Sequence, residues 1–270
     1  MSQSRIRATG LGLLAMLLVG SYAAATASAG GGPFWFHREI GSMGNGLKIS
    51  PQAPENFRGT GGRQTLIGTF SGGAVEVSAP SVQVKGAIFN TGAQGQIKLE
   101  IIYNQPEVLK PEKTPCAVTV GAKNIVTVKG HLVWKWNGMT TQLIEQPVLN
   151  QTPELLFTPK EMQQGATSLP GGTFTTLTFV GSGCGLLAGP QNVGGSEIGL
   201  PSPSEVLVWS KKLAVRTLSS GQGENLRIHF WNGSESIGVN AGLQFAGNAA
   251  NLIGQTEAEA AQQEISVQES

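Results

Sequence analysis

Residues 81–104 read SVQVKGAIFNTGAQGQIKLEIIYN, two alternating runs separated by the short segment Thr-Gly-Ala-Gln. In residues 81–90 and 95–104, most apolar side chains recur at every second position. Side chains on a β-strand point alternately to its two faces, so a period of two predicts a strand with one buried face. The stretch therefore predicts two β-strands in this part of the chain.

Similar alternating runs, punctuated by Gly, Pro and Asn, occur along most of the chain. Many short strands with regular turns predict an all-β fold, an antiparallel β-sandwich or barrel with at most one short helix. A weak helical pattern occurs in residues 153–164, and residues 256–265 have a helical composition but could equally form a final strand. The other predicted strands cover residues 74–78, 116–120, 124–136, 174–181, 205–210, 212–218, 225–231 and 242–247.

The N-terminus has the three regions of a secretory signal peptide. Arg5 and Arg7 precede an apolar core at residues 11–20, and Ala27-Ser28-Ala29 fits the small-x-small pattern of a cleavage site. The apolar core is shorter than the roughly 20 residues that cross a bilayer. We therefore expect a cleaved signal peptide at residues 1–29, a secreted or extracytoplasmic protein, and no later transmembrane segment. An uncleaved N-terminal anchor is the alternative.

The chain that remains after removal of 29 of the 270 residues is long enough for one large all-β domain or two small ones. We expect a flexible segment at residues 30–45, an all-β domain at 46–260 and a disordered tail at 261–270. The alternative divides the domain into two packed β subdomains near residues 150–170.

The charged residues restrict the chemistry that the chain can perform. It contains no Asp, which excludes a Ser-His-Asp triad, a pair of catalytic Asp residues and Asp-rich calcium loops. Without Arg5 and Arg7, 16 of the 18 Lys and Arg residues remain against 17 Glu. This balance offers no electrostatic argument for nucleic acid or for an anionic membrane. We expect no nucleic-acid partner and no cofactor, and the oligomeric state stays open.

Cys116 and Cys184 are the only two cysteines. An exported chain meets an oxidising environment, where two cysteines most often form a disulfide. Closing a loop of this length removes about 4 kcal/mol of unfolded-state freedom in the chain-entropy model. The alternative is a free thiol nucleophile, but neither cysteine has a histidine or another base near it in sequence. We therefore predict a Cys116–Cys184 disulfide.

Trp-Asn-Gly occurs twice, at residues 136–138 and 231–233, each time at the end of an alternating run. Asn-Gly in this place predicts a tight hairpin turn. In the second run the apolar residues share one face of the strand, and Arg227, His229 and Trp231 share the other. Arg and His can hydrogen-bond hydroxyl groups, and an indole can stack on a sugar. These three residues are the predicted ligand-binding site, for a glycan or a cell-envelope component; the alternative is a solvated face or one covered by a second layer.

AGLQFAGNAANLIG at residues 241–254, preceded by FWNG, resembles the C-terminal part of a group of exported β-rich proteins of unknown function from soil actinobacteria. The resemblance implies an exported β protein and a strand at residues 249–260. Members of the group often carry Cys where this chain has Ser78 and Asn104 or Gln105. The resemblance implies that a family disulfide there is absent from this chain, which leaves Cys116 and Cys184.

Three functions remain after these exclusions. The first is an exported, non-catalytic binding or structural protein of the cell envelope or extracellular space, which fits the export signal and the few catalytic groups. The second is a secreted glycoside hydrolase that uses two Glu residues, as carboxyl pairs do in such enzymes. The third is a metal site that combines His131, His229 and a Glu, although no His-x-His or Cys-x-x-Cys spacing supports it. The candidate Glu residues for the hydrolase are Glu100, Glu145 and Glu205.

Overall fold

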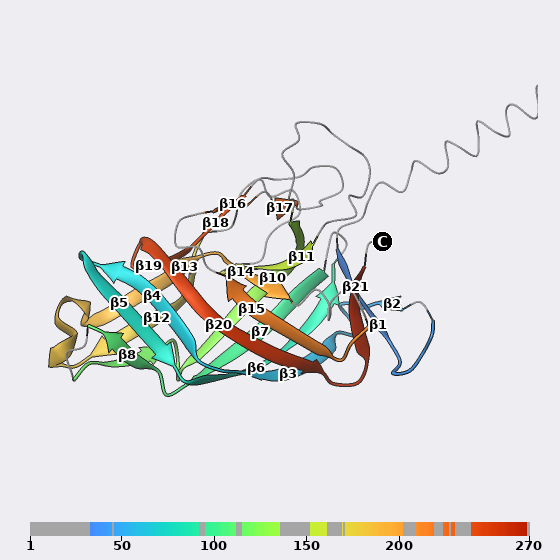
Figure 1. Cartoon of the computed structure of the whole chain (residues 1–270), viewed down its shortest axis with the longest axis horizontal. Helices are drawn as coiled ribbons and strands as arrows, with labels where there is room; N and C mark the ends of the chain where they lie inside the picture. Colours follow the sequence, from blue (N-terminus) through green and yellow to red (C-terminus); the bar gives the residue numbers. More distant parts are fainter. Residues whose placement is uncertain are drawn as a thin grey trace, which may run out of the picture.

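A computed structural model gives the fold, and it describes residues 33–44, 46–91, 95–111, 115–135, 152–160, 169, 171–201, 209–218, 224–226, 228–229 and 239–268. This part of the chain is all-β, with a single short 3-10 helix, η1 (Ser182–Leu187). The prediction of an all-β fold is confirmed. The structure is an eight-stranded antiparallel barrel with additional strands packed outside it, and Figure 1 shows that the barrel is elongated along its strands.

The barrel has eight strand positions around its circumference. At seven of them, two separate strands follow each other along the length of the barrel, and at the eighth a single long strand takes the place of both. Short links join most of these pairs: only Gly62 and Arg63 separate β3 from β4, and only Pro80 separates β5 from β6. The positions, in order around the barrel, are β3 (Glu55–Gly61) with β4 (Gln64–Phe70), β6 (Ser81–Asn90) with β5 (Gly73–Ala79), β7 (Gly95–Asn104) with β8 (Glu107–Lys110), β10 (Ile125–Lys135) with β9 (Ala117–Val120), β11 (Thr152–Thr158) with β12 (Thr173–Val180), β14 (Glu197–Pro201) with β13 (Gly189–Gly195), β15 (Lys212–Leu218) with β19 (Leu243–Phe245), and β20 (Asn248–Ala260) alone.

The long strand β20 closes the barrel. Its first half pairs with β19 and β4, and its second half pairs with β15 and β3. The strand implied by the resemblance at residues 249–260 is therefore present, despite the helical composition of its second half. Closure leaves the barrel without a free edge, which removes the unpaired backbone groups that otherwise invite aggregation.

The two segments expected to be flexible or disordered contain strands that pair with each other. Strand β1 (Phe34–Arg38) pairs with β21 (Glu264–Gln268) and with β2 (Leu47–Lys48), which makes a separate three-stranded sheet. Trp35 in β1 is fully buried. Its backbone N–H donates to Asn90 Oδ1 at 2.7 Å, and Asn90 Nδ2 donates to the Trp35 carbonyl at 2.7 Å. The expectations of a flexible segment at 30–45 and a disordered tail at 261–270 are therefore wrong for β1 and β21, because a buried Trp and a backbone ladder hold these two strands in place.

Two other expectations differ from the structure. Residues 153–158 belong to strand β11, not to a helix; all six are buried, so their apolar run shows no period of two. A division near residues 150–170 does not separate two bodies either, because strands from both sides of it are neighbours in the same barrel: β10 pairs with β11, and β9 with β12. The remaining strands are β16 (Glu224–Leu226), β17 (Ile228–His229) and β18 (Val239–Ala241).

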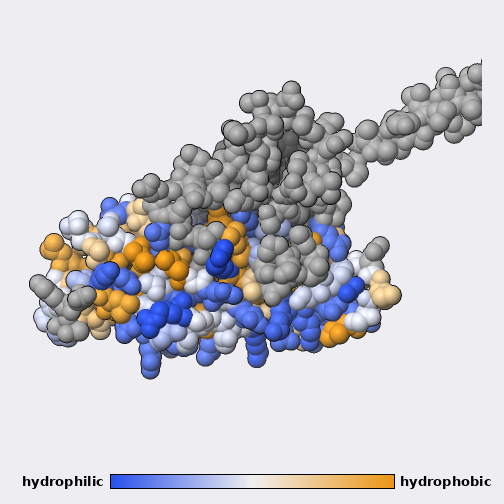
Figure 2. All heavy atoms as spheres, in the orientation of Figure 1, coloured by the Kyte–Doolittle hydropathy of each residue, from blue (hydrophilic) through white to orange (hydrophobic). Residues whose placement is uncertain are grey.

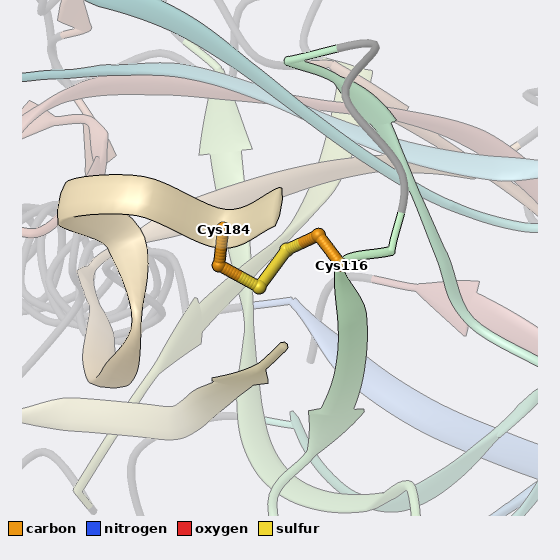
Figure 3. The surroundings of a disulfide bond; sticks show 2 residues. All are labelled: Cys116 and Cys184. Carbon is orange, nitrogen blue, oxygen red and sulfur yellow. A yellow bond between two sulfur atoms is a disulfide. The ribbon is translucent and has the colours of Figure 1, made fainter. Parts of the chain in front are cut away.

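The predicted disulfide between Cys116 and Cys184 is present. Cys116 lies just before β9, and Cys184 lies in η1, directly after β12 (Figure 3). Strands β9 and β12 are neighbours in the barrel, so the disulfide ties adjacent strand ends across a sequence separation of 68 residues. A cross-link over such a loop stabilises the fold by about 4 kcal/mol through the unfolded chain.

On the outer face of the barrel, several charged residues are paired across neighbouring strands. Lys85 lies opposite Glu100 in the register of β6 and β7, with Lys85 Nζ 2.7 Å from Glu100 Oε1. Lys110 and Glu76 are opposite each other in β8 and β5, with Nζ 3.4 Å from Oε2. Figure 2 shows hydrophilic residues gathered over the region of β3 and β6. In the described part of the chain, no helix has the length and apolar character needed to cross a membrane.

Candidate functional site

The predicted ligand-binding residues lie at the border of what the structure describes. Arg227 and Trp231 lie outside the described residues. His229 is described in its backbone alone, where it pairs with Trp134 of β10 in strand β17. The prediction of a shared binding face for these residues therefore stays a prediction.

The other sequence candidates are separated by the fold. Glu100 faces outward and is paired with Lys85, whereas Glu145 and Glu205 lie outside the described residues. His131 is buried in β10. Among the described residues there is no group of three or more His, Cys, Asp or Glu side chains that could hold a metal ion.

The interior of the barrel contains a cavity of about 140 Å³. It forms because every barrel strand turns alternate residues inward, and most of these residues are apolar. Strands from both halves of the barrel line the cavity. It therefore extends from one half of the barrel into the other. The apolar lining includes Phe57, Leu66, Val77, Val128, Leu155, Phe157, Leu177, Val193, Leu213 and Leu243.

Glu197 is the single carboxylic acid among the described residues that line this cavity. The chain reaches it through a kink between β13 and β14, where Gly195 has a φ of 85°. This backbone conformation favours glycine, because a side chain would clash there. A Cβ at Gly195 would also collide with the Gly242 carbonyl.

Ser196 holds the kink in place. Its backbone N–H donates to the Gly242 carbonyl at 3.1 Å, and its Oγ accepts from the Gly242 N–H at 3.1 Å. Glu197 then opens β14 opposite Phe157 of β11, a residue that also lines the cavity. The register with Phe157 fixes the Glu197 side chain on the inner face of the barrel.

The Glu197 carboxyl has little contact with solvent, and no cationic side chain is among the described residues that line the cavity with it. The residue is 6% exposed, and its buried Oε1 has no hydrogen-bond partner. Burial away from water disfavours the charged form, which raises the pKa of Glu197 from its usual 4.5 to about 9. At neutral pH the group is therefore a neutral carboxylic acid, which can donate one hydrogen bond and accept others.

Tyr103 is the titratable neighbour of Glu197. Burial, and then the field of the Glu197 carboxylate, raise the pKa of the Tyr103 phenol to about 12. Tyr103 lines the cavity near the end of β7, and it shares a row across the sheet with Val82 and Gly61. Gln64, Thr175 and Thr256 also line the cavity, so its few polar groups are neutral hydrogen-bonding side chains.

Sequence reasoning missed both the cavity and Glu197. Residues 196–201, SEIGLP, show no clear alternation, and a single Glu between Ser and Ile reads as an ordinary surface residue. One weak signal was available: Gly-Gly directly before Ser-Glu suggests a bend that can redirect the next side chain. Whether that side chain points inward depends on pairing with β11, which is distant in sequence.

No protein-family model matches the chain, and neither a curated protein nor a solved structure matches it. The resemblance to exported proteins of soil actinobacteria stays a prediction.

Proposed function

We propose that the chain is an exported, non-catalytic binding protein whose barrel holds a small apolar molecule in its interior. The observation that carries the proposal is the cavity of about 140 Å³ with an almost wholly apolar lining. Apolar cavities near this size stay dry and take up molecules such as benzene. A preformed apolar cavity with a few convergent polar groups is the usual form of a small-molecule site.

Two further features support export. The N-terminus has the pattern of a secretory signal, and the Cys116–Cys184 disulfide suits an oxidising compartment. A closed barrel with an internal site also suits a carrier or a sequestering protein, since the bound molecule is kept from water. These features support a cell-envelope or extracellular location.

Calorimetric titration of the purified chain, disulfide intact, with toluene tests the proposal. Toluene is small and apolar, so we expect saturable binding and a rise in melting temperature, because a ligand that binds only the folded state stabilises it. The variant Ala79→Phe places a ring in the cavity and should abolish binding. Ile253→Phe, at an exposed site in β20, is the matched control and should bind toluene normally. Absence of saturable binding by the unmodified chain would contradict the proposal.

A further inference from the structure

We infer that Glu197 recognises the head group of the bound molecule, and that this molecule is uncharged and carries an oxygen that accepts a hydrogen bond from the Glu197 carboxyl. The inference rests on the proposed function, because it assumes that the cavity is a ligand site. It adds the class of ligand: an apolar ketone, ester, ether or alcohol, as distinct from an amine or an acid.

The geometry leaves one polar position open. Glu197 projects from the inner face of β14 into an apolar lining, and its buried Oε1 has no partner. A buried polar atom without a hydrogen bond costs free energy, because it has lost its hydrogen bonds to water and gained none in return. A ligand that supplies the missing hydrogen bond recovers that cost, whereas a plain hydrocarbon leaves it unchanged.

The charges around Glu197 decide between ligand classes. No Lys, Arg or His is among the described residues that line the cavity. An anionic ligand would therefore lie beside a carboxyl group with no cation to receive it. Apart from Glu197, the described residues that line the cavity are apolar or neutral, among them Phe157 from β11, Leu213 and Val215 from β15, and Tyr103 from β7.

A cationic ligand is also disfavoured. An ammonium group would need Glu197 to lose its proton, and the resulting ion pair would sit in an apolar cavity. Two charges taken out of water are costly unless further hydrogen bonds satisfy them. A neutral oxygen avoids this cost, because it meets the carboxylic acid in the protonated form that burial already favours.

The inference predicts a particular dependence of affinity on pH. Burial raises the pKa of Glu197 to about 9, so the carboxyl keeps its donor proton below that pH. Affinity for a neutral oxygen ligand should be constant from pH 6 to pH 8 and should fall up to tenfold per pH unit above about 9. The nearest titratable group, Tyr103, loses its proton only near pH 12 and does not contribute in that range.

Four matched probes test whether the site prefers no head group, a neutral oxygen, a cation or an anion: toluene, acetophenone, benzylamine and benzoate, in that order. Each carries one benzene ring, so differences in affinity report the head group. For the full chain at pH 7 we expect acetophenone to bind about tenfold more tightly than toluene, the gain of one hydrogen bond. Benzylamine and benzoate should bind more weakly than acetophenone.

Variants at Glu197 complete the experiment. Glu197→Gln keeps a neutral donor, so it should keep the preference for acetophenone and lose the fall in affinity above pH 9. Glu197→Met removes the donor, so it should bind toluene and acetophenone equally. If Glu197→Met fails to fold, the pH series on the unmodified chain and on Glu197→Gln still decides.

The outcomes distinguish this inference from the proposed function. If toluene does not bind at all, the proposed function fails. If toluene binds and acetophenone binds no more tightly than toluene, the cavity is a ligand site but Glu197 does not recognise the head group. Tightest binding of benzylamine, with affinity that rises from pH 6 to pH 9, would overturn the inference in favour of a cationic ligand. Tightest binding of benzoate would overturn it in favour of an acid.

Discussion

The inner and outer faces of the same barrel treat carboxyl groups in opposite ways. On the outer face, Glu100 lies opposite Lys85 on the neighbouring strand, and the two charges are 2.7 Å apart. On the inner face, Glu197 is buried with an unpaired oxygen, and no Lys, Arg or His is among the described residues of the cavity lining. Exposed ion pairs contribute only about 0–1 kcal/mol, whereas an unpaired buried polar group costs more than that. The outer pair is an ordinary feature of a polar surface, while Glu197 works against folding and so points to a role in binding.

The largest expected effect concerns the titration of Glu197. The folded protein keeps the Glu197 proton up to about pH 9, but the unfolded chain releases it near the usual pKa of 4.5. Between those pH values the folded state binds more protons, so the free energy of unfolding falls as pH rises. The slope is about 1.4 kcal/mol per pH unit, on the order of 6 kcal/mol in all. Glu197→Gln should remove this slope and be more stable than the unmodified protein at pH 8.

Urea unfolding at pH 4.5, 6, 7, 8 and 9 measures the effect, in a range where Tyr103 stays protonated. Glu100→Gln is the matched control: Glu100 faces outward, so this variant should follow the pH dependence of the unmodified protein. A stability difference between Glu197→Gln and the unmodified protein that is the same at every pH would show that Glu197 ionises normally in the folded state. The carboxyl groups of Glu197 and Glu100 would then not differ in their ionisation, contrary to the comparison between the inner and outer faces.

The next effect compares two apolar residues on one strand. In β12, Leu177 is 3% exposed and lines the cavity, whereas Val180 is 62% exposed. Leu177→Ala deletes buried methyl groups and enlarges the cavity, so we expect a loss of about 2–5 kcal/mol of unfolding free energy. Val180→Ala should change it by at most about 0.5 kcal/mol. Chemical denaturation of both variants measures the difference. Equal losses would mean that β12 does not turn Leu177 inward.

Local alternation allowed much of the fold to be predicted. Residues 81–90 and 95–104 read correctly as strands because β6 and β7 each have one apolar and one polar face. The disulfide was also predictable, since the chain has only two cysteines. Strand β11 was misread because both of its faces are buried, which removes the period of two.

Barrel closure and the site depend on contacts between distant parts of the chain. Glu257 lies opposite Thr60, and Ala258 opposite Gly59, in the register of β20 and β3. No local pattern specifies such a pairing, so sandwich and barrel could not be separated from sequence. Glu197 was missed for the same reason, because its inward direction follows from the pairing of β14 with β11. Burial of a polar residue breaks the local pattern, and such breaks are expected at functional sites.

The smallest expected effect is on the outer face, where Lys85→Ala removes the partner of Glu100. The side chain of Lys85 is 57% exposed and that of Glu100 is 31% exposed, so water solvates both charges and salt screens their attraction. Glu100 left alone can turn toward solvent, unlike Glu197, and needs no new partner. We therefore expect a loss of at most about 1 kcal/mol, which becomes smaller as salt is added. A double-mutant cycle with Glu100→Ala, measured by urea unfolding at low and high salt, isolates the interaction. A coupling well above that value, and insensitive to salt, would mean that the outer face is less exposed than the barrel geometry implies, and the two carboxyl groups would no longer represent opposite environments.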